Sequence, residues 1–154
     1  MDGEHLMEIT DEQKYLGFVL SSNGKNTSNI ALRRGKGIGS VRQIISILDD
    51  IHFGSHKYKV AIVLRNSMLI NSMLYNSEVW YSLSVSEIEM LEKVDEMLLR
   101  GILSLPHSTP CPLLYLELGC LPIRYIVMSR RLNFLHSLLR EEKIHYYIKF
   151  FMLN

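Results

Sequence analysis

Asp49 and Asp50 are the only adjacent aspartates in the chain, and paired carboxylates can hold the metal ions of two-metal phosphoryl transfer. That chemistry needs both side chains aimed at one metal from a rigid support, such as a sharp turn after a strand. The pair instead follows Ile45 and Leu48, which continue a helical pattern of apolar residues. We therefore interpret the two aspartates as the solvated end of a helix and predict no metal site there.

The other groups that could do chemistry lack the spacing that it requires. Four potential zinc ligands match no CxxC or HxxxH arrangement, namely His107, Cys111, Cys120 and His136. No serine lies in a Gly-x-Ser-x-Gly elbow. The run from Gly35 to Ser40 is not a Walker loop, because its lysine precedes the second and third glycines. We predict no catalytic residue and no metal or cofactor site in this chain.

Basic residues gather around the start of the first predicted helix. They are Lys25, Arg33, Arg34, Lys36 and Arg42, and no acidic residue occurs between Ser28 and Ser40. A glycine-containing basic segment suits contacts with a phosphate backbone, where position matters more than the reading of bases. An ordinary solvated face is the alternative. Arg124 and Arg131, seven residues apart on the last predicted helix, either contact nucleic acid too or border a partner surface.

Composition limits the class of protein but does not choose a function. The chain has 154 residues, 47% of them hydrophobic, which is enough for one domain with a core. The 17 Lys and Arg residues nearly balance the 16 Asp and Glu residues, giving a net charge of +1. The whole-chain charge therefore gives no argument for nucleic-acid binding, which would depend on a local basic face.

The sequence favours an intracellular protein, nuclear or cytoplasmic, that is not secreted. Two cysteines do not make a disulfide scaffold, and the acidic, polar start from Met1 to His5 is unlike a signal peptide. The most apolar stretch, Val60 to Trp80, is interrupted by charged and amide residues such as Arg65 and Glu78. A bilayer span tolerates these poorly, so we predict a buried helix and no membrane partner.

Hydrophobic patterning predicts a mainly α fold, with a short N-terminal β-hairpin followed by a bundle of four to five helices. The strands are expected at Leu6–Thr10 and Lys14–Leu20, on either side of a turn at Asp11–Gln13. The first helix is expected from Ser28 to the break at Phe53–Ser55, frayed or kinked by its glycines.

Three further helices and a short helical segment follow in the predicted order. The helix from Lys57 to Tyr81 is apolar nearly all round, which indicates a central position in the bundle. Ser84 and Glu87 form a capping box that starts the next helix. One or two helical turns are expected at Leu113–Leu118. The last helix runs from Ile123 to about Arg140, with an inner stripe at Met128, Leu132, Leu135 and Leu139.

Four segments of the chain resemble motifs of LINE-type (non-LTR) retrotransposon reverse transcriptases, in the order of that family. Lys14–Phe18 resembles the "KYLG" segment that closes the palm. Leu74–Trp80 resembles the "LxYGxExW" thumb signature, and Leu91–Leu103 resembles the "LExxxxxxLRxIL" helix that follows it. Tyr115–Arg124 is similar to a "YxExGxxPxR" segment. The resemblance extends from Tyr15 to about Phe150, although Asn76 and Ser77 stand where the family has Gly or Ala.

The resemblance implies a piece of an RNA-directed DNA polymerase. Residues 1–24 would be a palm-end hairpin remnant, with Tyr15, Leu16 and Gly17 in the primer-grip region, and residues 25–154 a thumb-like domain truncated at its C-terminus. The catalytic aspartates, and the Mg²⁺ that they bind, would belong to a palm N-terminal to Met1, so this chain alone is expected to be inactive.

Two functions follow as expectations. The first is contact with an RNA–DNA hybrid or primer–template duplex, together with the missing palm and fingers. The alternative is a non-catalytic helical protein-interaction module, or a decayed or domesticated transposon remnant.

Overall fold

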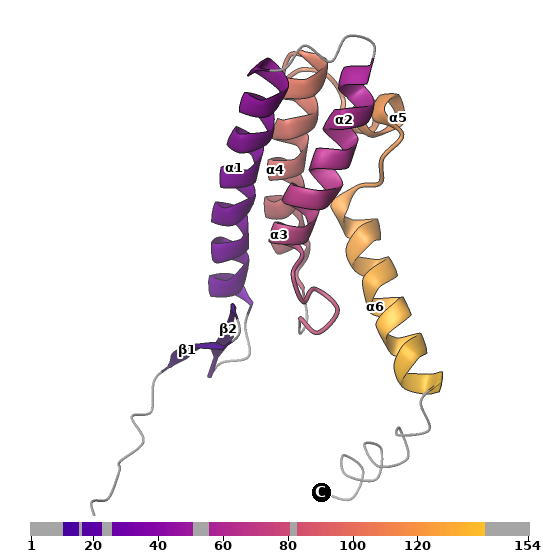
Figure 1. Ribbon diagram of the computed structural model, residues 1–154. Helices are drawn as coiled ribbons and strands as arrows, with labels where there is room; N and C mark the ends of the chain where they lie inside the picture. Colours follow the sequence, from indigo (N-terminus) through magenta and orange to yellow (C-terminus); the bar gives the residue numbers. More distant parts are fainter. Residues whose placement is uncertain (1–10, 16, 23–25, 51–55, 81–82, 141–154) are drawn as a thin grey trace, which may run out of the picture.

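The computed structural model describes residues 11–15, 17–22, 26–50, 56–80 and 83–140 (Figure 1). The chain is mainly helical with a short hairpin at its N-terminal end, which confirms the predicted fold class. The described elements are β1 (Glu12–Tyr15), β2 (Phe18–Ser21), α1 (Thr27–Asp50), α2 (Lys57–Leu64), the π-helical segment η2 (Arg65–Ile70), α3 (Asn71–Met73), α4 (Val85–Leu103), α5 (Cys111–Leu118) and α6 (Ile123–Arg140).

The hairpin has a different register from the predicted one. Strands β1 and β2 pair antiparallel from Glu12 opposite Ser21 to Tyr15 opposite Phe18. Glu12 and Gln13, predicted in a turn, therefore lie in a strand, and Gly17, the described residue between the two strands, has a φ of +77°. Glycine adopts a positive φ without steric cost, which favours the turn at this position. The predicted strand Leu6–Thr10 lies outside the described residues.

Helix α1 is continuous, so the predicted fraying or kinking at its glycines is wrong. The reason is tertiary packing: one face of α1 lies against α4, and Ile30, Val41 and Ile44 on this face are almost fully buried. Gly37 lies where α1 comes close to both α3 and α4, since a Cβ there would be 2.6 Å from the Met73 sulfur and 3.1 Å from a Val94 methyl carbon. Burial of this face outweighs the propensity cost of about 1 kcal/mol per glycine.

This packing predicts opposite effects of alanine at two glycines of one helix. Gly37→Ala should lower the free energy of unfolding by about 1–2 kcal/mol, because the new methyl group overpacks buried Met73. Gly39→Ala should raise it by up to about 1 kcal/mol, because a Cβ at Gly39 meets open space. Urea unfolding followed by circular dichroism measures both. Equal shifts of the same sign would contradict the packing of α1.

The second predicted helix ends earlier than expected, and only its second half, with Leu69 and Met73 fully buried, has the predicted central position. Helical backbone runs from α2 through η2 to the end of α3 at Met73, not to Tyr81, and Asn76 then adopts a left-handed φ of 57°. Within α2 only Ala61 is buried, while Tyr58 and Val63 are more than half exposed. One side of α2 therefore faces solvent, although the helix is apolar nearly all round.

Helix α4 holds the central position, because it packs against α1, α5 and α6 (Figure 1). It starts at the predicted capping box: the Ser84 hydroxyl accepts a hydrogen bond from the Glu87 amide, and the Glu87 carboxylate accepts one from the Ser84 amide. Leu91 and Leu98 are fully buried along α4. Each such side chain stabilises the fold by about 1.5–3 kcal/mol.

Helix α6 has the predicted bounds and α5 begins at Cys111, two residues before the predicted start, but α6 is turned differently. Gly119 ends α5 with a φ of +60°, and α6 faces the core with Ile123 and Val127. The predicted inner stripe of Met128, Leu132, Leu135 and Leu139 is 52–63% exposed, so that prediction is wrong. Among the described helices none is long and apolar enough alone to cross a membrane; α5 and α6, bent by 64°, pass that test of length and composition together.

Candidate nucleic-acid interface

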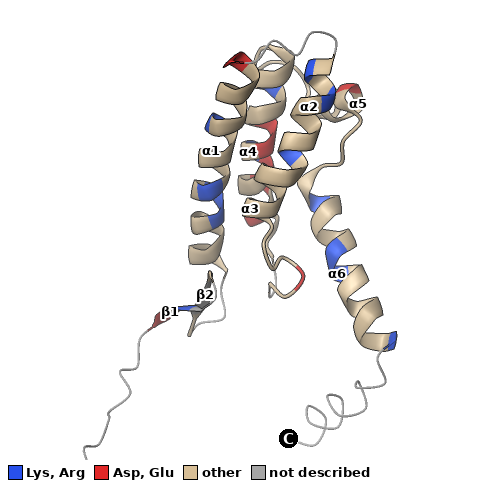
Figure 2. Cartoon of the chain, in the orientation of Figure 1, with Lys and Arg blue, Asp and Glu red and all other residues tan. Residues whose placement is uncertain are grey.

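Three of the predicted basic residues form an exposed cationic face on α1. Arg34, Lys36 and Arg42 are all exposed, and none of them forms an ion pair within the described part of the chain. Figure 2 shows basic residues along α1, most of them in the half near the hairpin, whereas its two aspartates lie at the opposite end. The three charges extend over about 12 Å along the helix axis, since each residue adds about 1.5 Å.

The backbone of α1 is open to approach between these charges. A Cβ added at Gly35 or Gly39 would have no neighbour within 4 Å. At about 100° of rotation per residue, Arg34 and Lys36 flank the glycines on opposite sides. We call this surface, made of Arg34, Gly35, Lys36, Gly39 and Arg42, the cationic face.

Arg33 takes a different place from its neighbour Arg34. Its side chain is 1% exposed, and its guanidinium donates hydrogen bonds to the Gly17 carbonyl at 2.8 Å and the Ser72 carbonyl at 3.4 Å. It also lies over the Tyr75 ring, 5.0 Å from the centroid. Burial lowers the pKa of Arg33 from its ordinary value. Arg33 thus joins the hairpin to α1 and α3 and does not present its charge on the cationic face.

The residues predicted for the primer-grip region lie near this joint. Tyr15 ends β1 opposite Phe18, and the carbonyl of Gly17 is the acceptor for Arg33. Strand β2 packs against α1, and the Ser28 hydroxyl donates to the Glu12 carboxylate. The hairpin is therefore attached to the N-terminal half of α1, which carries Arg34 and Lys36. Leu16 and Lys25, also predicted in the site, lie outside the described residues.

Arg124 and Arg131 are not brought together with the cationic face, because they belong to α6 on the other side of α4 (Figure 1). Arg124 donates two hydrogen bonds to the Glu92 carboxylate, at 2.8 and 2.6 Å. The bonds from Arg124 lower the pKa of Glu92, and Glu92 raises the pKa of Arg124. Arg131 donates to the Trp80 carbonyl at 2.6 Å and thus holds the segment after α3 against α6.

A buried ion pair that the sequence analysis missed fixes the centre of the bundle. Arg65 donates to both oxygens of the Asp95 carboxylate at 2.6 Å and to the Leu121 carbonyl at 2.9 Å. Both side chains are at most 1% exposed. Burial raises the pKa of Asp95, and the pairing with Arg65 opposes that shift. The sequence did contain a signal for this pair, because each residue is a charge within an apolar helical pattern. Arg65 interrupts the most apolar stretch, and Asp95 follows Val94 in the apolar stripe of the next helix.

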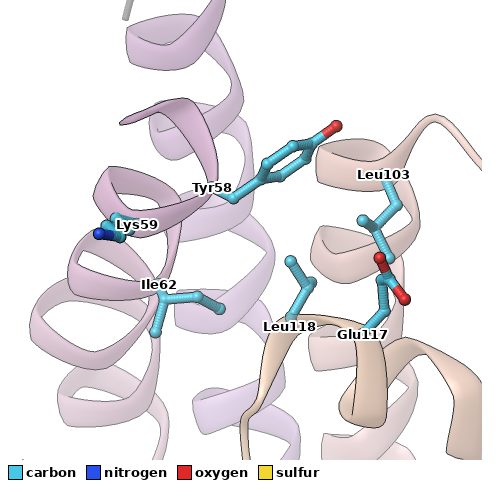
Figure 3. A pocket seen from close by; sticks show the side chains of 6 residues that line it. All are labelled: Tyr58, Lys59, Ile62, Leu103, Glu117 and Leu118. Carbon is cyan, nitrogen blue, oxygen red and sulfur yellow. The ribbon is translucent and has the colours of Figure 1, made fainter. Parts of the chain in front are cut away.

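The described residues contain no constellation for catalysis. Burial raises the pKa of both thiols, Cys111 and Cys120, so neither is activated as a nucleophile at neutral pH. Among the described residues, no three His, Cys, Asp or Glu side chains gather as metal ligands. A cleft of about 400 Å³ lies between α2, α4 and α5 (Figure 3). Its walls include Tyr58, Ile62 and Leu118, and its two charged residues, Lys59 and Glu117, point away from each other (Figure 3).

Comparisons with protein-family models, with curated proteins and with solved structures found no match for this chain. The resemblance of four segments to LINE-type reverse transcriptases therefore stays a prediction. Several of these segments contribute to the contacts described above: Asp95 accepts from Arg65, Glu92 accepts from Arg124, and Tyr75 lies under Arg33. These motif residues have structural roles in the bundle, so the cationic face is the candidate for function.

Proposed function

We propose that this chain is the palm-end and thumb region of a LINE-type reverse transcriptase and contacts an RNA–DNA hybrid or primer–template duplex through the cationic face. The observation that supports this best is the exposure of Arg34, Lys36 and Arg42 on one helix, without an acidic residue between Thr27 and Leu48. The four motif resemblances agree with this proposal, and they are a separate line of support from the cationic face.

The physical chemistry of the cationic face suits a phosphate backbone rather than base edges. Lysine and arginine side chains neutralise phosphates and release condensed counterions, which gives affinity without sequence preference. The open backbone at Gly35 and Gly39 allows a bulky duplex to approach α1 closely. Attachment of the hairpin through Arg33 fixes the position of α1 relative to the strands that precede it.

In this role the chain binds the duplex, and catalysis would belong to the palm of the reverse transcriptase. Mg²⁺ and the aspartates that hold it would belong to that palm. The described residues contribute positioning of the duplex, through charges held on a rigid helix. Polymerisation by this chain alone is not expected.

Salt-dependent binding of an RNA–DNA hybrid tests the proposal. The triple variant Arg34→Ala, Lys36→Ala, Arg42→Ala should flatten the plot of log affinity against log salt by about 2–3, since each neutralised phosphate contributes about 0.9 to the slope. Fluorescence anisotropy over a salt series measures this slope. The hybrid should be bound equally well whatever its base sequence.

The control keeps the same change in net charge. Lys59→Ala, Lys93→Ala, Arg140→Ala removes three exposed cations from other helices and should leave the slope nearly unchanged. If both triple variants flatten the slope equally, binding follows net charge and the cationic face is not a site. If neither variant changes it, these residues do not contact the hybrid.

A further inference from the structure

Helix α6 carries apolar side chains on two opposite faces. Ile123 and Val127 pack inward on α4. At about 100° per residue, Leu132 and Leu139 are directed roughly 140–160° away from the mean direction of those two residues. We call the second set the outward seam; its members are Tyr125, Met128, Leu132, Leu135 and Leu139, and all are 52–63% exposed. A helix needs only one apolar face to pack on its own bundle, so the outward seam is not needed for the packing of α6 on α4.

The spacing of the outward seam is that of a helix–helix interface. Its members follow one another at intervals of three, four, three and four residues, from Tyr125 to Leu139. This is the a/d repeat of a coiled coil, in which side chains of one helix insert between those of another. An exposed stripe of this kind on a folded domain marks an interaction surface rather than scattered apolar residues.

The charge of α6 indicates which kind of helix fits. Between Ile123 and Arg140 there are four arginines and no acidic residue. Arg124 is paired with Glu92 and Arg131 donates to the Ser77 and Trp80 carbonyls, while Arg140 is exposed next to Leu139 at the end of the outward seam. Positions beside an a/d seam select a partner through charge, so a helix with acidic flanking residues complements α6. A second copy of α6 would instead bring further arginines against these.

We infer that the outward seam docks an amphipathic α-helix from a partner protein, with an apolar a/d stripe flanked by Asp and Glu. This surface is separate from the cationic face, because α4 lies between α1 and α6 (Figure 1). The inference goes beyond nucleic-acid binding and does not depend on it. The chain would hold a duplex through α1 and a protein helix through α6.

Two synthetic three-heptad peptides test the inference with the full chain. Both have Leu at a and d; one has Glu at e and g, and the other has Lys there. The acidic peptide should bind at least tenfold more tightly by fluorescence anisotropy, and its affinity should fall with salt. The variant Leu132→Glu, Leu135→Glu should weaken this binding tenfold or more. Both side chains are more than half exposed, so the variant should remain folded.

Two further variants test whether the peptide binds at the outward seam itself. Leu113→Glu, Leu116→Glu places the same charges on exposed positions of α5 and should leave peptide binding unchanged. His136→Glu, Arg140→Glu keeps the seam but should reverse the preference between the peptides, even if the leucine variant fails to fold. Equal binding of the two peptides would overturn the inference. So would a homodimer, detected by light scattering, that dissociates in the leucine variant.

Discussion

Replacing Asp95 with alanine should lower the free energy of unfolding by about 3–5 kcal/mol, because it leaves a buried guanidinium without its carboxylate. In the folded chain Arg65 donates to both Asp95 oxygens at 2.6 Å, and neither side chain is more than 1% exposed. The Leu121 carbonyl accepts one further bond from Arg65 and cannot replace a negative charge. Urea unfolding followed by circular dichroism measures the loss.

The exposed acid Glu89 on the same helix provides the control. Glu89→Ala should change the free energy of unfolding by less than about 0.5 kcal/mol. The double variant Arg65→Met, Asp95→Leu should recover much of the loss, because both buried charges are removed together. A loss below about 1 kcal/mol in Asp95→Ala would contradict a buried, ionised pair at the centre of the bundle.

Replacing Arg33 with alanine should lower the free energy of unfolding by about 2–4 kcal/mol. Hydrogen bonds from a charged group contribute about 1.5–3 kcal/mol, and truncation of a buried side chain leaves a cavity as well. The lost contacts are those to the Gly17 and Ser72 carbonyls and to the Tyr75 ring. Because Arg33 joins the hairpin to the helices, amide exchange in β2 should accelerate more than exchange in α4.

Arg34→Ala is the matched control one residue away. Arg34 is exposed, so this variant should keep the stability within about 0.5 kcal/mol and should weaken binding of the RNA–DNA hybrid. Equal destabilisation by the two variants would contradict the different places that the structure assigns to these neighbours. If Arg34→Ala bound the hybrid with the same affinity as the unchanged chain, Arg34 would not be part of the binding surface.

Features set by local interactions were predicted well from the sequence. The Ser84–Glu87 capping box depends on residues three apart, and the end of α5 depends on the left-handed backbone of Gly119. The hairpin register was not predicted, although Gly17 favours the turn that the structure has. Strand-forming residues continue on both sides of that glycine, so their pattern alone did not place the turn.

Features set by tertiary packing could not be predicted from periodicity. A repeat of three and four residues predicted a stripe at Met128 and Leu132, but it does not say whether the stripe faces the core or solvent. Adjacent residues on a helix point about 100° apart, so Arg33 and Arg34 have different surroundings despite identical chemistry. The partners that decide this, such as Ser72, are distant in sequence from Arg33.

Nuclear magnetic resonance mapping of hybrid binding tests the proposed function most directly. The isotope-labelled full chain would be titrated with an RNA–DNA hybrid at physiological salt, and backbone amide shifts would be followed residue by residue. We predict the largest changes at Gly35, Gly39 and their neighbours on α1, and none along the outward seam of α6. Changes confined to α6, or no changes at hybrid concentrations that saturate binding, would contradict a duplex-binding face on α1.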